Sequence, residues 1–121
     1  MGQGLNRRAF ALAALALGAM NIDAAAAREK QLPASEEEKQ AAIQQMVECF
    51  RVNAPNYDDG VSDASTIGTA VASSCNADIL SAADVVAQGQ NQRTQYYVRE
   101  NFVKNGGEIA TRVVLQVRTA K

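Results

Sequence analysis

The two cysteines, Cys49 and Cys75, are the residues of this chain whose type could most directly carry out chemistry. As thiols they could form a redox pair, and as a disulfide they would cross-link the fold. Redox-active thiols need a neighbour that lowers their pKa, whereas these cysteines are widely spaced in a chain without histidine. The pattern therefore favours a structural disulfide, which would stabilise so small a domain by about 3–4 kcal/mol in the chain-entropy account.

A run of side chains with oxygen atoms follows Cys49 and could supply ligands for calcium. It comprises Asn56, Asp58, Asp59 and Asp63. An EF-hand loop that begins at Asn56 would place its glycine one position after Gly60, and it would need a glutamate at its last position. Turn formation and helix capping account for the same residues without a metal, so we predict no metal ligand.

Asp58 and Asp59 are adjacent and could act as paired carboxylates in a hydrolase. Neighbouring residues on an exposed turn have no evident means of shifting their pKa values, so we do not expect catalysis from them. The chain has no histidine and no glycine-rich phosphate loop, and two cysteines cannot complete a four-ligand zinc site. We therefore predict no catalytic residue, no cofactor and no enzymatic activity. The alternative is a thiol-redox factor or enzyme that uses Cys49 and Cys75.

The first 27 residues have the features of a secretory signal peptide. Arg7 and Arg8 form a positive segment, residues 9–20 form a short apolar core, and the alanines at 24–27 offer a cleavage site. A phenylalanine two positions after the arginine pair resembles the twin-arginine export motif, and the general secretory route stays open beside it. The chain is therefore predicted to be periplasmic or secreted, without a membrane span after cleavage. The alternative is that this segment is retained as a membrane anchor.

Charge is distributed unevenly along the remaining residues. The range Glu29–Asp84 carries 10 acidic and 3 basic side chains, whereas Val85–Lys121 carries 6 basic and 2 acidic ones. The simplest interpretation is that the two halves fold against each other and neutralise. The alternative is a basic face for an anionic partner. Nucleic acid is not expected, because the basic residues are scattered and the chain is predicted to be exported.

We expect residues 28–34 to form a flexible lead and residues 35–121 to form a single small domain. Ser35 and Glu38 form a capping box that begins the first helix, and Pro55 is expected to end it. Its apolar positions recur at helical spacing: Ile43, Met46, Val47, Phe50 and Ala54.

A turn at 56–60 leads into a second helix, which Ser62 or Asp63 would cap. Its apolar stripe comprises Ile67, Val71, Cys75, Ile79, Ala82 and Val86. The polar residues around Cys75 allow a break near Asn76. An antiparallel hairpin of the two helices would bring the cysteines together.

The chain beyond the connector at 88–92 fits two structures. Two helices, 93–104 and 108–119, would flank Asn105-Gly106-Gly107, and a β-hairpin over 93–119 would use the same residues as its turn. The hairpin register places Arg99 opposite Arg112, which is unfavourable, so we favour helices. The predicted fold is thus all-α, a small helical bundle built on a disulfide-stapled helical hairpin. Tyr96 and Tyr97 are interpreted as core aromatics rather than an exposed contact patch.

The region Cys49–Cys75 contains the pattern C-x-R-x-x-A, then D-D-G, S-D-A and T-I-x-x-A-V-x-x-x-C. It resembles small exported helical proteins of proteobacteria that carry two spaced cysteines and whose function is unknown. The resemblance extends loosely to Val113–Arg118, and it implies a helical C-terminal segment but no activity. Together with the residues above, it predicts a soluble, non-catalytic binding or interaction protein of the bacterial envelope. Its partner would be an unknown protein or small molecule.

Overall fold

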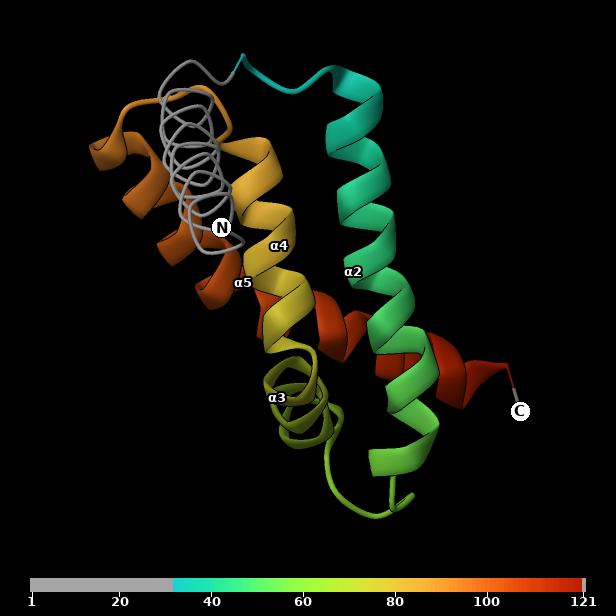
Figure 1. Ribbon diagram of the computed structural model, residues 1–121. Coiled ribbons are helices and arrows are strands. Elements are labelled where there is room, and N and C mark those ends of the chain that lie inside the picture. Colours follow the sequence, from blue (N-terminus) through green and yellow to red (C-terminus); the bar gives the residue numbers. More distant parts are fainter. Residues whose placement is uncertain (1–31, 121) are drawn as a thin grey trace, which may run out of the picture. The chain divides into compact units, whose positions relative to one another are not determined.

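Four α-helices make up most of residues 32–120, the part of the chain that the computed structural model describes (Figure 1). They are α2 (Glu36–Tyr57), α3 (Ala64–Ser74), α4 (Asn76–Val86) and α5 (Gln92–Thr119). These residues contain no β-strand. The all-α prediction is therefore confirmed, and the alternative β-hairpin at 93–119 is wrong. The predicted signal peptide at 1–27 lies outside the described residues.

The start of α2 follows from its capping box. The Ser35 hydroxyl accepts a hydrogen bond from the Glu38 backbone N–H at 3.2 Å and donates one to the Glu38 carboxylate at 3.3 Å. The predicted end at Pro55 is wrong, because α2 continues to Tyr57. Proline in the last turn removes one backbone donor, and the helical pattern resumes where the Asp58 N–H donates to the Ala54 carbonyl at 3.0 Å.

The second predicted helix is divided at Cys75, close to the break expected near Asn76. Asp63 caps α3 by accepting a hydrogen bond from the Thr66 N–H at 2.8 Å. Cys75 lies between α3 and α4, and no side chain caps the first turn of α4. The disulfide Cys49–Cys75 joins α2 to this junction, with 6.0 Å between the Cα atoms. The predicted disulfide-linked hairpin is thus confirmed.

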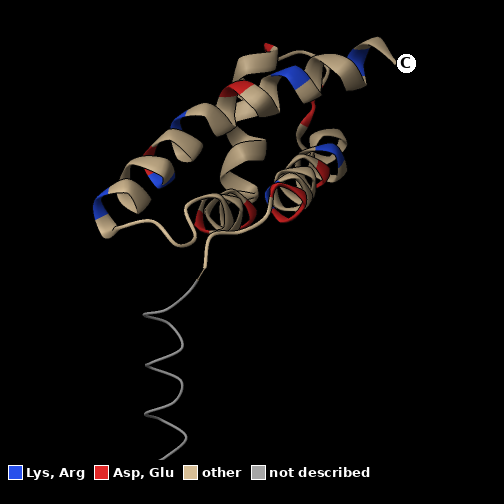
Figure 2. Cartoon of the chain, turned by 90° about the horizontal axis from the view of Figure 1, so that it is seen from above, with Lys and Arg blue, Asp and Glu red and all other residues tan. Residues whose placement is uncertain are grey.

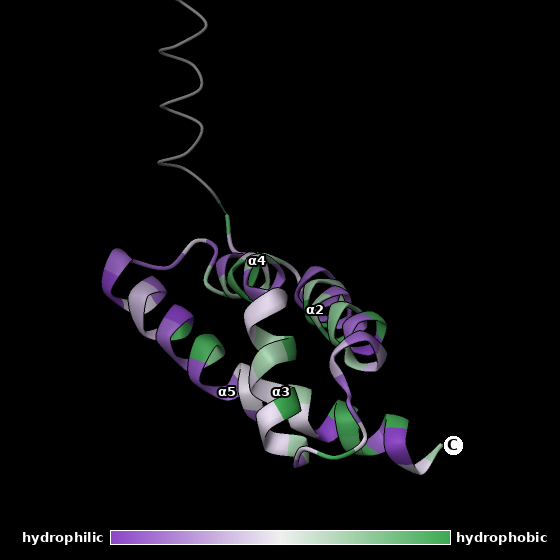
Figure 3. Cartoon of the chain, turned by 90° about the horizontal axis from the view of Figure 1, so that it is seen from below, coloured by the Kyte–Doolittle hydropathy of each residue, from purple (hydrophilic) through white to green (hydrophobic). Residues whose placement is uncertain are grey.

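The core is formed by the apolar stripes of all four helices. Figure 3 shows apolar and polar stretches alternating along the helices, which is the pattern of a half-buried surface. The buried cluster comprises Met46, Phe50 and Ala54 from α2, Ile67 and Val71 from α3, Cys75 at the junction, Ile79 and Ala82 from α4, and Ala110, Val113 and Val114 from α5. Burial of these side chains is the main stabilising term of the fold.

α5 is one continuous helix of 28 residues rather than the two helices predicted. Asn91 begins it by accepting a hydrogen bond from the Thr94 N–H at 2.8 Å. The expected turn at Gly106 lies inside it, because this glycine serves packing instead. A Cβ at Gly106 would lie 2.9 Å from Cδ1 of Ile79, so its absence lets α5 approach α4 closely.

The loop between α4 and α5 contacts the segment that precedes α2. Gly89 has a φ of +81°, and a Cβ at this position would lie 2.6 Å from the backbone nitrogen of Pro33. Only glycine combines that backbone conformation with that approach. Ala34 is buried, so this residue packs on the helices, whereas Pro33 and Ser35 on either side of it are exposed.

Two ion pairs connect the acidic and basic halves of the sequence. Arg118 of α5 pairs with Asp58 at 2.7 Å, and Arg99 of α5 pairs with Asp84 of α4 at 3.1 Å. Figure 2 shows the ribbon positions of Lys and Arg spread along α5 and many of those of Asp and Glu on α2 and α4. The halves therefore contact each other with opposite charge, as the simpler interpretation of the sequence predicts.

Candidate functional site

The two cysteines form a disulfide in which Cys75 is buried and Cys49 is partly exposed. Cys75 is 1% exposed, and the side-chain nitrogen of Asn53 lies 3.4 Å from the sulfur of Cys49 and 3.6 Å from that of Cys75. The same nitrogen donates to the Cys49 carbonyl at 2.8 Å. The residues around the sulfurs thus hold the cross-link in place, and the burial of Cys75 limits attack by an external thiol.

The carboxylates considered as ligands or catalysts are used for local structure. Asp59 accepts hydrogen bonds from the Val61 N–H at 2.9 Å and the Ser62 N–H at 2.7 Å. Hydrogen bonding to Ser62, chiefly by its hydroxyl, lowers the pKa of Asp59 below its ordinary value. Hydrogen bonding to Thr66 does the same for the pKa of Asp63. Both groups therefore stay ionised and are weak bases at neutral pH.

The sequence predicts that the carboxylates of Asp58 and Asp59 are both exposed on a turn. For Asp58 this is wrong. Its side chain is 2% exposed and is covered by Arg118, whose Nε lies 3.1 Å from Oδ2. The hydrogen bond to Asp58 raises the pKa of Arg118 above its ordinary value. The two carboxylates therefore have separate partners and do not form an acid–base pair. Asn56, the fourth candidate ligand, lies in the last turn of α2, and no group of acidic and cysteine side chains in residues 32–120 could hold a metal ion.

Tyr96 and Tyr97 are exposed, so their interpretation as core aromatics is wrong. They are 60% and 55% exposed, and their rings meet edge to face with centroids 5.8 Å apart. The reason lies in the length of α5, whose buried positions begin only at Gly106. Tyr96 and Tyr97 therefore remain in solvent, whereas Phe102, further along the helix, packs against the core.

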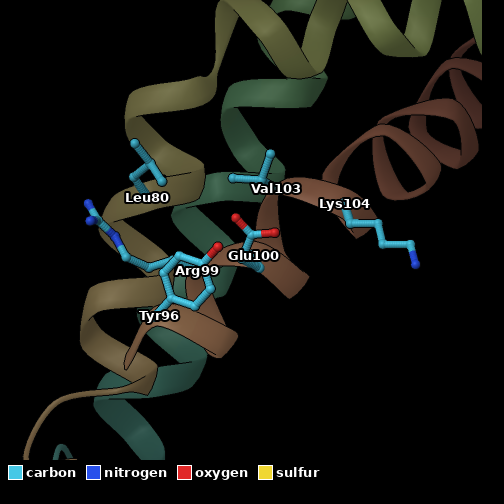
Figure 4. Close-up of a pocket in the computed structure, with 6 residues that line it drawn as sticks. All are labelled: Leu80, Tyr96, Arg99, Glu100, Val103 and Lys104. Atoms are coloured by element: carbon cyan, nitrogen blue, oxygen red, sulfur yellow. The ribbon is translucent and has the colours of Figure 1, made fainter. Parts of the chain in front are cut away.

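An open groove of about 480 Å³ lies beside Tyr96, between α4 and α5 (Figure 4). It is lined by Leu80 of α4 and by Tyr96, Arg99, Glu100, Val103 and Lys104 of α5. The ion pair to Asp84 fixes Arg99 against α4. Leu80, Tyr96 and Val103 give this half of the groove an apolar floor.

A second hollow of about 280 Å³ continues the groove toward α3. It shares Val103 and Lys104 with the first and is otherwise lined by Thr69, Ala72, Ser73, Asn76, Ile79 and Gly107. We call the two hollows together the α5 groove. We call the half next to Tyr96 the apolar half. We call the half next to Gly107 the polar half, because Thr69, Ser73, Asn76 and Lys104 line it beside apolar residues. A separate hollow of about 510 Å³ follows α2 alone and contains no aromatic side chain.

Sequence reasoning missed the α5 groove because its residues share no motif. The one signal in the sequence is the pair Tyr96-Tyr97 with its flanking arginines, a pattern that fits core aromatics as well as an exposed contact patch. Within residues 32–120, no helix is long and apolar enough to cross a membrane. No protein-family model, curated protein or solved structure matches this chain.

Proposed function

We propose that this chain is a small, exported, non-catalytic protein of the bacterial envelope that binds a partner protein through the α5 groove. The observation that carries the proposal is the exposure of Tyr96, which lines the groove with Leu80 and Val103 and has the exposed ring of Tyr97 against it. Aromatic side chains are enriched at protein interfaces because they bury a large area at little entropic cost. Side chains of this size placed in solvent offer a partner a ready contact surface.

The openness of the groove favours a macromolecular partner over a small molecule. Small-molecule sites are concave and bury most of the ligand surface. Here Tyr96 and Val103 both stay at least half exposed while they line the groove. A small ligand on such a surface would keep much of its own area in water, whereas a protein segment would cover the groove from above.

A binding role fits the use of the polar groups better than catalysis does. Asp59 and Asp63 act as turn and helix caps, and Asp58 is held by Arg118. The thiol-redox alternative would require an accessible sulfur, and the burial of Cys75 favours a structural cross-link instead.

The disulfide supports the export part of the proposal. Disulfides persist in oxidising compartments such as the periplasm and are rare in the bacterial cytosol. The decisive measurement is the intact mass of the protein recovered from its native envelope, alkylated with and without reduction. A start near Arg28 with two protected thiols is expected. A full-length chain with two free thiols would refute both the export and the disulfide.

The binding role is tested by placing a photo-crosslinking amino acid at Val103 in the native host. We expect a discrete crosslinked product from Val103 that disappears when Tyr96→Ala is added. Gln116, which is exposed on the far half of α5, is the matched control position and should give none. Equal products from both positions, or none from Val103, would contradict the proposal.

A further inference from the structure

Gly107 has no packing role in the fold. It lies inside α5, and a Cβ built on it meets no atom within 4 Å. Its neighbour Gly106 differs, because a Cβ there would meet Ile79. Glycine in a helix interior is less favourable than alanine, so the fold alone gives no reason for Gly107. It lines the polar half of the α5 groove, where the missing side chain leaves backbone open to an approaching chain.

The polar half of the groove contains one positively charged side chain and no negatively charged one. Lys104 lies one turn before Gly107 and forms no ion pair within residues 32–120. Ser73 and Asn76 line the same hollow, and both are exposed to solvent. No carboxylate lines this half. A negatively charged group placed here would meet one cation and two neutral donors.

The apolar half of the groove favours an apolar side chain of a ligand over an acidic one. Leu80, Tyr96 and Val103 form its floor, and Glu100 lies among them. Arg99 is neutralised locally by Asp84. Lys104 lies one turn after Glu100 and lines both halves, so an incoming acidic group would be repelled on the Glu100 side of this lysine and favoured on its Gly107 side. The charges thus set the direction in which a bound segment would lie.

We propose that the α5 groove holds an extended acidic peptide segment of the partner protein. A carboxylate of that segment would pair with Lys104 beside Ser73 and Asn76. Its backbone would pass over Gly107, and an apolar side chain would lie between Leu80 and Tyr96. This inference rests on the proposed function and specifies the partner class that the same groove binds.

The test selects a random peptide library, displayed on phage, against the mature protein. We expect the selected peptides to contain aspartate or glutamate together with an aliphatic or aromatic residue. Lys104→Gln should weaken their binding by about tenfold, and Lys104→Arg should largely retain it. Gly107→Ala should weaken binding as strongly, because its methyl group occupies the path of the peptide. An unchanged or raised thermal midpoint for Gly107→Ala separates this loss from misfolding.

Any other result of the peptide selection would contradict the inference. Selected peptides that are neutral or basic, or that ignore both Lys104→Gln and Gly107→Ala, would show that the groove does not recognise acidic segments. Failure to select any peptide would do the same. Self-association of the protein that Lys104→Gln abolishes would assign the groove to a second copy. The crosslink at Val103 separates these results from a failure of the proposed function, since it persists whenever the groove binds some partner.

Discussion

Arg118 and Asp58 are 60 positions apart in the sequence and form a two-point ion pair. Nη2 of Arg118 lies 2.7 Å from Oδ1 of Asp58, and Nε lies 3.1 Å from Oδ2. Nη2 also donates to the Ser62 carbonyl at 2.7 Å. These contacts fix the last turn of α5 to the end of α2 and to the loop that precedes α3. Planar two-point geometry of this kind is specific to arginine.

We expect Arg118→Gln to destabilise the fold, because it leaves the enclosed carboxylate of Asp58 without its cation. Arg51→Gln is the matched control, since Arg51 pairs with Glu48 at 3.7 Å and both side chains are more than half exposed. Such surface pairs contribute little to stability. Urea unfolding should therefore give a clearly lower midpoint for Arg118→Gln than for Arg51→Gln. Equal midpoints would mean that the Arg118 pair contributes no more than a surface contact.

We expect the fold to lose stability in acid, because Asp59 and Asp63 cap backbone N–H groups as carboxylates. The pKa values of Asp59 and Asp63 lie below the ordinary value of 3.8 in the folded chain. Their stabilisation is therefore complete above about pH 4 and is lost as the pH falls through the lowered folded-state values. Urea unfolding between about pH 6 and pH 2 should show this decline. Asp63→Asn retains a capping side chain but cannot titrate, so its decline should be shallower. If the stability of Asp63→Asn declined with pH in parallel with that of the parent protein, titration of Asp63 would not contribute to the loss of stability in acid.

The helix starts could be predicted because their determinants are local. Ser35 and Asp63 are caps that act within one turn, and apolar spacing places Met46 and Phe50 in the core. The disulfide followed from the same reasoning, since two antiparallel helices of this length bring Cys49 and Cys75 together. In each case the residues that decide the structure are neighbours in sequence or on one helix face.

The continuity of α5 could not be predicted in this way. A glycine in a turn and a glycine at a helix crossing look alike in sequence, and only the position of Ile79 distinguishes them for Gly106. The exposure of Tyr96 depends on how far α5 extends beyond the core. The pairing of Asp58 with Arg118 depends on the packing of helices that are distant in sequence. All three features arise from tertiary contacts that leave no local pattern.

Loss of the disulfide should lower the free energy of unfolding by about 3 kcal/mol. The two cysteines are 26 positions apart, and opening a loop of that length restores conformational freedom to the unfolded chain. The double variant Cys49→Ala and Cys75→Ala should unfold at the same denaturant concentration with and without reductant. The parent protein should shift to a lower concentration when it is reduced. A parent midpoint that ignores complete reduction would contradict a stabilising role for the cross-link.

Gly68 of α3 and Gly107 of α5 should respond to alanine in opposite directions. Gly107→Ala should raise the free energy of unfolding by about 1 kcal/mol, because it gains helix propensity without a clash. Gly68→Ala should lower it by about 1–3 kcal/mol, because the new Cβ would lie 2.7 Å from the backbone nitrogen of Thr111 and force α3 and α5 apart.

Thermal and urea unfolding of both variants measures this contrast. Destabilisation by Gly107→Ala would mean that glycine is required there by the fold, and the reason for assigning this position to partner binding would then be lost. If Gly107→Ala stabilises the fold and abolishes peptide binding, glycine at this position lowers helix stability but leaves the α5 groove open to the peptide.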